Sequence, residues 1–310
     1  MWHCKSIFLN LTNLCNVRCK KCITPRVIRK HGELSKELLY FILNLLESHN
    51  FNGVIRCGVG ENLIYSHIDF LIKELSIRNS PTKFEILTNG LAFPIEKEIF
   101  YNNPAIKWGV TLDGMTQDDL KGLQLGLDIN SVKQKLFQIK CRHPECNMYL
   151  NYTLHNKNIN HLLDFIKMCL DLNVGQIFVT PLKVFENHYT AYLSKLIPDL
   201  SLHFVQSLFS EIRQIANQNK IQIHLPETSK KFRPCSLTGN YSPIIDIDGA
   251  VSFCTGHENK RIGNVVDPHI GNIWKKMRMR TRFEKRISNF CKNCLNLNNS
   301  NKRILSMPAV

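Results

Sequence analysis

The sequence has no run of apolar residues long enough to cross a bilayer, although 44% of its 310 residues are hydrophobic. It has no signal peptide, because its N-terminus, Met1-Trp2-His3-Cys4-Lys5, leads directly into a segment that reads as a strand. Internal repeats and low-complexity segments are also lacking. These absences argue against a membrane-spanning or secreted protein, and they predict a cytoplasmic protein in which thiols stay reduced.

Acidic residues are scarce, since 25 Asp and Glu stand against 40 Lys and Arg, a formal net charge of +15. This excess favours anionic partners, although an Asn-, Lys- and Ile-rich composition can also reflect the base composition of the coding DNA. The densest basic run, residues 275–286, is predicted to be a solvated helix face or, alternatively, a docking site for an acidic peptide or a phosphate-bearing substrate. Too few aromatic residues accompany it to predict binding of nucleic acid.

Twelve cysteines are too few for a disulfide scaffold in a chain of this length, but more than an ordinary soluble enzyme has. Cys15, Cys19 and Cys22 follow a short apolar run that reads as a strand. Thiolates select zinc or iron–sulfur clusters, and this spacing without a nearby histidine fits zinc poorly. The three cysteines fit a [4Fe-4S] cluster whose fourth iron has no protein ligand and can bind a chelating cofactor. Buried cysteines without a metal are the alternative.

The pattern Cys-x3-Cys-x2-Cys after a first strand resembles the radical S-adenosylmethionine (SAM) superfamily. The resemblance implies that the open iron binds the amino and carboxylate groups of SAM. It also implies that one electron, from a donor such as flavodoxin or ferredoxin, cleaves SAM to methionine and a 5′-deoxyadenosyl radical, which abstracts a substrate hydrogen. The family often has an aromatic residue before the last cysteine, where this sequence has Lys21, so adenine contacts are expected partly from elsewhere.

Hydrophobic periodicity predicts six strands that alternate with helices. Besides the strand before Cys15, strands are expected at residues 53–56, 83–87, 106–112, 148–153 and 176–180, and helices at 35–48, 68–77, 94–102, 129–140 and 160–172. This alternation predicts a parallel α/β sheet, and the resemblance implies a partial (β/α)6 barrel. A helix at 200–219 and a strand at 221–225 are expected to bridge to a C-terminal part, which divides the chain into domains 1–226 and 227–310.

Special residues fall at the ends of the predicted strands, where parallel barrels place their chemistry. After the second strand, Gly58, Gly60 and Glu61 resemble the family's Gly-Gly-Glu segment, whose backbone and carboxylate hold the SAM amino group. A plain turn is the alternative, and Asn62 stands where the family often has proline. Strand-end capping is an equally good interpretation of the polar residues that end later strands. The candidates for contact with SAM or substrate among them are Thr88, Asn89, Thr111, Asp113 and Asn151.

Cys57 ends the second predicted strand, near the expected SAM site. A thiol beside a radical can return a hydrogen atom to a substrate radical, so Cys57 is a speculative catalytic hydrogen donor. A buried, inert thiol is the alternative interpretation, because free cysteines are among the most buried residues.

A second group of cysteines lies near the C-terminus. Its members are Cys235, Cys254, Cys291 and Cys294. Two apolar runs around Asp248-Gly249 predict a β-hairpin between the first two. The four cysteines suit a zinc ribbon on chemical grounds, but in this context they resemble the cysteine-rich SPASM/twitch domain of radical SAM enzymes. The resemblance implies one auxiliary [4Fe-4S] cluster, saturated by four thiolates, with an electron-transfer or structural role. Zinc or a second auxiliary cluster is the alternative.

The resemblance therefore implies a radical SAM iron–sulfur enzyme that abstracts hydrogen from a substrate C–H bond. Modification of a ribosomally synthesised peptide is the first expectation, because this is the commonest role of the domain and a basic surface suits an acidic leader. The lack of a leader-recognition domain before the first strand counts against it. Oxidation of a hydroxyl on a sugar or aminocyclitol is the alternative, and an RNA-modifying or nucleic-acid-binding metalloprotein is a distant one.

Overall fold

The structure is a computed structural model that describes residues 5–22, 31–78, 80–182, 189–226, 242–252, 261 and 263–269. The predictions made for Cys235, Cys254, Cys291, Cys294 and residues 275–286 lie outside these ranges. No helix within them combines the length and the apolar character that a membrane crossing requires.

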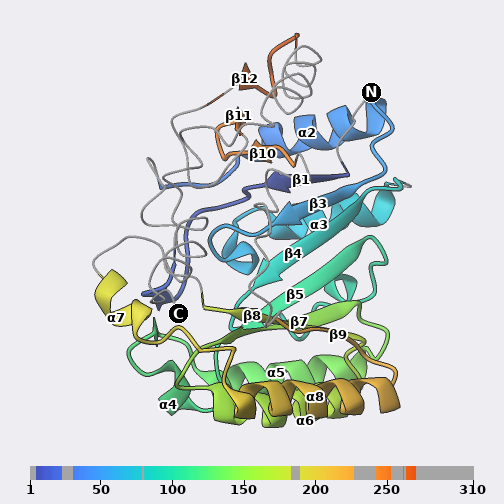
Figure 1. Cartoon of the computed structure of the whole chain (residues 1–310). Helices are drawn as coiled ribbons and strands as arrows, with labels where there is room; N and C mark the ends of the chain where they lie inside the picture. Colours follow the sequence, from blue (N-terminus) through green and yellow to red (C-terminus); the bar gives the residue numbers. More distant parts are fainter. Residues whose placement is uncertain are drawn as a thin grey trace.

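Ten strands of the described part form one sheet in the order β12-β11-β10-β1-β3-β4-β5-β7-β8-β9 (Figure 1). Six strands in and beside its centre are parallel to one another. They are β1 (Ser6–Leu9), β3 (Val54–Cys57), β4 (Lys83–Thr88), β5 (Ile106–Leu112), β7 (Met148–Leu154) and β8 (Gln176–Pro181). The predicted α/β fold with six parallel strands is confirmed.

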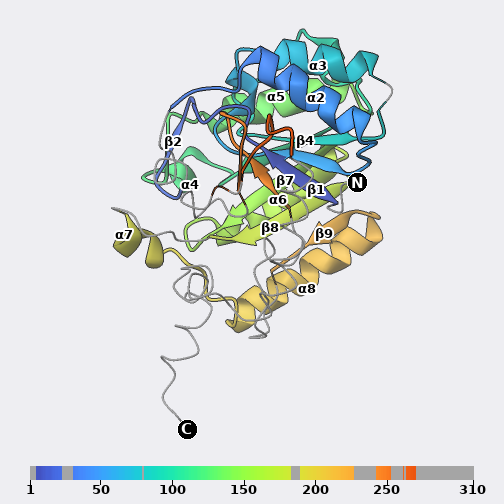
Figure 2. The same ribbon diagram turned by 90° about the horizontal axis from the view of Figure 1, so that it is seen from above.

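The longer helices of the described part lie beside the strands that they connect, α2 and α3 near β1 and β3 and α5, α6 and α8 near β7 to β9 (Figures 1 and 2). They are α2 (Lys36–Ser48), α3 (Ile68–Ile77), α5 (Ile129–Arg142), α6 (Leu162–Asp171) and α8 (His203–Gln218). Side chains fix where two of them begin. Ser35 accepts a hydrogen bond from the Leu38 amide at the start of α2, and the Asp128 carboxylate caps α5 in the same way.

Side chains alternate between the two sides of the sheet, and the side that faces the helices is the more apolar. Ile86, Val110 and Leu150 are fully buried in the core that the strands share with the helices. Their chain neighbours Glu85 and Asn151 point to the other side and are half-buried. The side of the sheet away from the helices therefore carries polar side chains such as these beside apolar ones such as Phe178, and it is the side on which a ligand can be received.

Residues 94–102 do not form the predicted helix. The structure has only a short 3-10 turn, η2 (Glu98–Phe100), in this crossover. Aromatic packing explains the difference, because Phe100 stacks on Trp108 and its carbonyl accepts a hydrogen bond from the indole nitrogen at 2.9 Å. The Tyr101 hydroxyl also donates to the Pro94 carbonyl at 2.9 Å, so side chains satisfy backbone groups that a helix would pair internally.

Several short elements were not predicted from the sequence. β2 (Arg18–Cys19) and β6 (Gln124–Leu125) pair as a separate antiparallel ribbon, and α4 (Gln117–Leu120) precedes β6. A capping box begins α4, since Thr116 and Asp119 each accept a hydrogen bond from the other's backbone amide. Elements of two to four residues carry no periodic pattern, so hydrophobic spacing does not reveal them.

The C-terminal hairpin and the bridging strand both belong to the main sheet. β10 (Ile244–Ile245) and β11 (Ala250–Ser252) form the predicted hairpin, with Gly249 at φ +78°, and β12 (Gly263–Asn264) follows. β10 pairs in parallel with β1, while β9 (Gln222–His224) pairs in parallel with β8 at the opposite edge. The strand expected at 221–225 is thus the seventh parallel strand of the barrel sheet rather than only a connection.

Candidate active site

Cys15, Cys19 and Cys22 lie on a loop, residues 10–22, that follows β1 and is called the cysteine loop below. Cys15 is exposed, and Cys19 and Cys22 are half-buried. Within the described residues, no three His, Cys, Asp or Glu side chains converge on a point where one metal ion would bind. A four-iron cluster sets a different requirement, because each thiolate binds a different iron. Three thiols on one loop with no fourth ligand fit that requirement.

Burial shapes the chemistry of these thiols. It raises the pKa of Cys19 to about 12, an effect strengthened by the nearby Asp113 carboxylate and opposed by the Lys21 ammonium. Burial also raises the pKa of Cys15, although backbone amides oppose it. Iron binds the thiolate and not the thiol, so the loop must release protons when it takes up a cluster.

The glycine–glutamate turn after β3 presses directly against the cysteine loop. Gly60 has φ +68°, and a Cβ atom there would lie 2.6 Å from the carbonyl oxygens of Thr12 and Leu14. The Glu61 amide donates to the same Leu14 oxygen at 2.7 Å. Only glycine permits both this conformation and this approach, so Gly60 is required for the contact between the two motifs. Gly58 is exposed at the end of β3.

The Glu61 carboxylate is 1% exposed and is occupied by protein donors. Its Oε1 accepts from the Thr88 hydroxyl at 2.6 Å and the Leu63 amide at 3.1 Å, and its Oε2 accepts from the Asn89 amide at 2.7 Å. Burial raises the pKa of Glu61, while these hydrogen bonds oppose the shift. Glu61 therefore joins the ends of β3 and β4. Because Oε2 accepts one hydrogen bond and Oε1 accepts two, Oε2 can more readily accept a further one.

Thr88 and Asn89 have their own partners at the end of β4. The Thr88 hydroxyl accepts from the Gly90 amide at 2.9 Å. The Asn89 side chain accepts from the Leu91 amide at 3.0 Å and donates to the Asn16 Oδ1, in the cysteine loop, at 2.8 Å. These bonds favour the strand-end capping interpretation of both residues, and they add a second attachment of the cysteine loop.

Asp113 directly follows β5, and its carboxylate forms an ion pair with Lys21. Lys21 is not among the site residues predicted from the sequence. The Lys21 Nζ donates to the Asp113 Oδ1 at 2.6 Å and to the Thr153 hydroxyl at 2.8 Å. The Asp113 side chain is 3% exposed, so this ion pair is nearly shielded from water. Lys21 thus fastens the cysteine loop to the carboxyl ends of β5 and β7.

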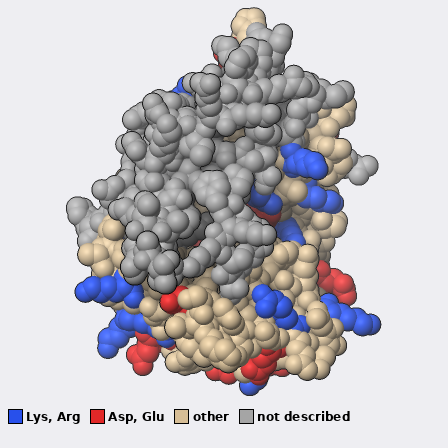
Figure 3. Space-filling model, viewed as in Figure 1, with Lys and Arg blue, Asp and Glu red and all other residues tan. Residues whose placement is uncertain are grey.

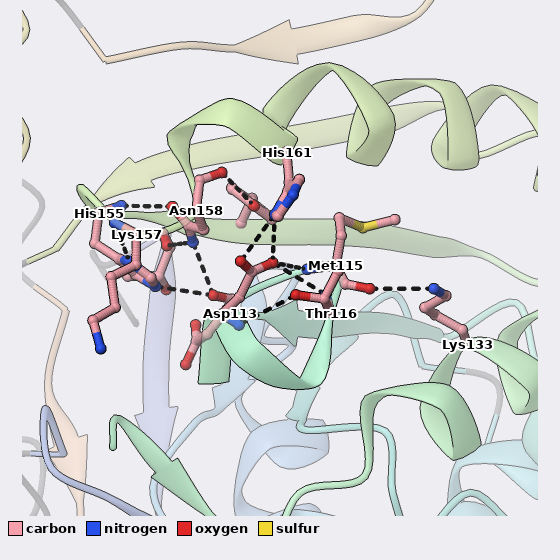
Figure 4. Close-up of polar contacts among 11 residues, drawn as sticks. Asp113, Met115, Thr116, Lys133, His155, Lys157, Asn158 and His161 are labelled. Carbon is pink, nitrogen blue, oxygen red and sulfur yellow. Dashed lines mark hydrogen bonds and ion pairs between the residues drawn. The ribbon is translucent and has the colours of Figure 1, made fainter. Parts of the chain in front are cut away.

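A network of buried hydrogen bonds holds the backbone carbonyl of Asp113 (Figure 4). The Asn158 Nδ2 donates to the carbonyl oxygens of Asp113 and Thr153, both at 2.8 Å. His155 Nδ1 accepts from the Lys157 amide, so its Nε2 carries the proton and donates to the Asp113 carbonyl at 3.1 Å. Burial lowers the pKa of His155, which keeps the imidazole neutral in this tautomer.

Thr111 and Asn151 are paired neighbours on β5 and β7, on the polar side of the sheet. Both are half-buried, and Asn151 Oδ1 accepts from the Thr180 hydroxyl at 3.2 Å. Farther from the strand ends on the same side, Glu85 accepts from Arg56 at 3.0 Å and from Tyr149 at 2.5 Å. A row of polar side chains therefore leads along the sheet toward the cysteine loop.

Cys57 lies on the other side of the sheet. It is fully buried in the apolar core, and burial raises the pKa of its thiol. Its register neighbour in β4 is the core residue Ile86, whereas the polar row contains the neighbouring Arg56. This placement favours the interpretation of Cys57 as an inert core thiol over that of a hydrogen donor.

Two buried side-chain oxygens in the described part have no hydrogen-bond partner, and both belong to segments that flank the cysteine loop. They are Asn62 Oδ1 and Gln124 Oε1. Asn62 Nδ2 donates to the carbonyls of Cys57 and Leu87, which places the side chain between the ends of β3 and β4. In the sequence, Asn62 stands out only as a departure from proline, and Gln124 has no periodic signal because its strand is two residues long.

The chain is similar in sequence to a family model and to several known proteins. A family model for SPASM, an iron-sulfur cluster-binding domain, matches residues 235–295. The GTP 3′,8-cyclase of Clostridium botulinum (strain Okra / Type B1) is 26% identical over 190 residues, which cover 58% of this chain and 59% of the cyclase. The sporulation killing factor maturation protein SkfB of Bacillus subtilis is 24% identical over 169 residues, which cover 53% of this chain and 39% of SkfB. The chain thus spans less than two thirds of each of these relatives.

The fold is similar to that of a solved structure, SuiB of Streptococcus suis. For SuiB bound to S-adenosylmethionine the TM-score is 0.70 at 14% identity, and the match covers 94% of this chain and 71% of SuiB. For SuiB bound to the precursor peptide SuiA the TM-score is 0.63 at 14% identity, with coverage of 87% and 64%. At these identities the likeness establishes the architecture, in agreement with the barrel sheet and the C-terminal hairpin.

Proposed function

We propose that this chain, a member of the radical SAM superfamily and of its SPASM subgroup, cleaves SAM reductively and uses the 5′-deoxyadenosyl radical to abstract a hydrogen atom from a peptide. The observation that supports this best is the contact between the cysteine loop and the glycine–glutamate turn. Two separate matches to the family's sequence pattern lie against each other, with Leu14 O accepting from Glu61 N at 2.7 Å. Both motifs follow adjacent parallel strands, β1 and β3, so they meet at the edge of the sheet where parallel barrels place their chemistry.

The cofactors are [4Fe-4S] clusters and SAM. In our proposal Cys15, Cys19 and Cys22 hold the cluster that delivers an electron to SAM, and the bound cofactors supply the radical chemistry. The unpartnered Asn62 Oδ1 and the Glu61 Oε2 are acceptors at the ends of β3 and β4 that suit the SAM ammonium. The exposed backbone of Gly58 allows the same ligand to approach closely.

The other predicted site residues take different parts in this proposal. Thr88 and Asn89 orient Glu61 and the cysteine loop, and Asp113 holds Lys21 in place. Thr111 and Asn151 face the polar side of the sheet and are the proposed contacts for ribose or substrate. The proposal also includes a domain division at 226/227, one auxiliary cluster on the C-terminal cysteines named above, an electron donor such as flavodoxin or ferredoxin, and a cytoplasmic location.

A peptide substrate is supported by the relatives and by charge. SkfB is a maturation protein of a killing factor, and the SuiB structure contains a precursor peptide. The net charge of +15 suits an acidic leader segment. On the face shown in Figure 3, the described Lys and Arg side chains are interspersed with Asp and Glu and form no continuous basic patch.

The reaction is tested by measuring 5′-deoxyadenosine after anaerobic reconstitution with iron and sulfide and addition of SAM and a strong reductant. We expect the wild type to form it and the Cys15→Ala variant to form none. Cys141→Ala is the matched control, because Cys141 is an exposed cysteine outside the site and its loss should leave the yield unchanged. Equal yields from wild type and Cys15→Ala would contradict the proposal.

The substrate class is tested by deuterium transfer. Peptides encoded beside the gene, labelled with deuterium, should pass the label to 5′-deoxyadenosine and change mass by loss of hydrogen. Deuterated aminocyclitols and sugars serve as the comparison. Transfer from one of these, with none from the peptides, would contradict a peptide substrate and support the dehydrogenase alternative.

A further inference from the structure

The β2–β6 ribbon places Gln124 opposite a proposed cluster ligand. In its antiparallel register Cys19 faces Gln124 and Arg18 faces Leu125. The Lys20 amide donates to the Leu123 carbonyl at 2.8 Å, which makes that pair a hydrogen-bonded one. The next pair, Cys19 and Gln124, is therefore of the non-hydrogen-bonded kind, in which facing side chains come closest together.

The Gln124 side chain is buried, and its amide oxygen has no hydrogen-bond partner. It is 6% exposed, and its Oε1 has no hydrogen bond. A buried primary amide that makes no hydrogen bond loses free energy, so such groups are rare unless a partner arrives later. The two ends of the amide have nearly the same shape, and a half-turn about the last side-chain bond exchanges the acceptor for the NH2 donor. Gln124 can therefore offer a donor to an anion that is held beside it.

We infer that Gln124 is a positioning residue for the SAM-cleaving cluster: its side-chain NH2 donates a hydrogen bond to the Cys19 sulfur when that sulfur is a cluster ligand. This inference rests on the proposed function, since it requires a cluster on Cys19. A hydrogen bond to a ligand sulfur stabilises the reduced, more negative cluster more than the oxidised one. Gln124 thus makes the cluster easier to reduce.

The inference is tested on the full-length, reconstituted protein by EPR-monitored redox titration. The SAM-binding cluster is identified by the change that SAM produces in its spectrum. Gln124→Met keeps the length of the side chain without the donor, and we expect it to disfavour reduction of this cluster about tenfold, equivalent to about 59 mV for one electron. Gln124→Glu also removes the amide donor, and at a pH at which the introduced carboxyl is ionised its negative charge should disfavour reduction further.

Leu125→Met is the matched control, because Leu125 follows Gln124 in β6, points to the opposite side of the ribbon and is 54% exposed. The reduction potential of the SAM-binding cluster in Leu125→Met should equal that in the wild type. A Gln124→Met variant that holds the wild-type amount of iron and shows the wild-type potential would overturn the inference. If Gln124→Met does not retain its cluster, the potential of Gln124→Glu with its carboxyl ionised decides, and an unchanged value there overturns the inference equally. Failure of the wild type itself to cleave SAM would instead contradict the proposed function.

Discussion

At the scale of single residues, Lys21 attaches the cysteine loop to the ends of two strands. The family often has an aromatic residue before its last cluster cysteine, and a lysine there cannot stack in the same way. In this chain its ammonium contacts Asp113 and Thr153 instead. When one residue of an ion pair is removed and its partner is nearly buried, the loss of folding free energy is large, because the remaining charge is left without compensation.

We expect Lys21→Met to loosen the cysteine loop and to destabilise the fold by about 1–3 kcal/mol, less than a fully buried pair because the lysine side chain is 20% exposed. Hydrogen exchange of residues 10–22 should become faster, and the melting temperature of the anaerobic protein should fall. Lys21→Arg keeps the charge and should recover part of the loss. Wild-type exchange rates in Lys21→Met would show that the pair does not hold the loop.

The second prediction at this scale concerns pH and His155. Burial lowers its pKa in the folded state, so below about pH 6.5 the unfolded chain binds a proton at this position that the folded protein does not. Stability therefore falls as pH decreases from 6.5, by up to about 1.4 kcal/mol per pH unit from this group. In urea unfolding, His155→Gln should show a shallower loss between pH 7 and pH 5.5. The same pH dependence in wild type and variant would exclude His155 as its source.

At the scale of elements, long periodic segments were predictable and short ones were not. The helix at 68–77 and the strand at 106–112 have the predicted bounds. In each segment several apolar residues repeat at the spacing that is typical of that element. The helix expected at 94–102 is absent, since aromatic side chains pack there and satisfy the backbone. The position of the candidate site followed from the strand ends, whereas its hydrogen bonds depend on contacts between residues far apart in the sequence.

The glycine–glutamate turn provides the prediction at this scale. Gly60→Ala adds a Cβ atom 2.6 Å from two carbonyl oxygens at a residue with φ +68°. The left-handed conformation alone costs about 1–2 kcal/mol for a residue other than glycine. We expect the turn to shift away from the cysteine loop and the iron content after reconstitution to drop.

Gly175→Ala is the control for this variant, because no atom lies within 4 Å of the Cβ position at Gly175 and its φ is not positive. It should keep the wild-type iron content and melting temperature. A Gly60→Ala protein with full iron content and normal SAM cleavage would show that close approach at this turn is not needed.

At the scale of the whole molecule, the sheet runs through the predicted domain boundary. β10 pairs with β1, so the C-terminal hairpin covers the strand that leads into the cysteine loop. Sequence reasoning placed the boundary at residues 226/227 from the composition of a loop, and composition does not indicate which strands pair. In the barrel sheet of residues 1–226 alone, β1 therefore keeps β3 as a neighbour and loses the one on its other side.

We expect a fragment of residues 1–226 to expose β1 as an edge strand and to aggregate or melt at a lower temperature than the full chain. Size-exclusion chromatography and thermal unfolding of the two proteins, both prepared anaerobically, measure this. A monomeric fragment with the melting temperature of the full chain would show that the two parts are independent.

The attachments of the cysteine loop also determine when it can be completed during biosynthesis. Lys21 reaches Thr153, 132 positions later, and the strand before the loop pairs with a hairpin more than 200 positions away. A ribosome delivers these partners long after the cysteines themselves have left the exit tunnel. In our proposal the cluster binds to Cys15, Cys19 and Cys22, so the fully attached form of its binding loop becomes available only after most of the chain has been synthesised.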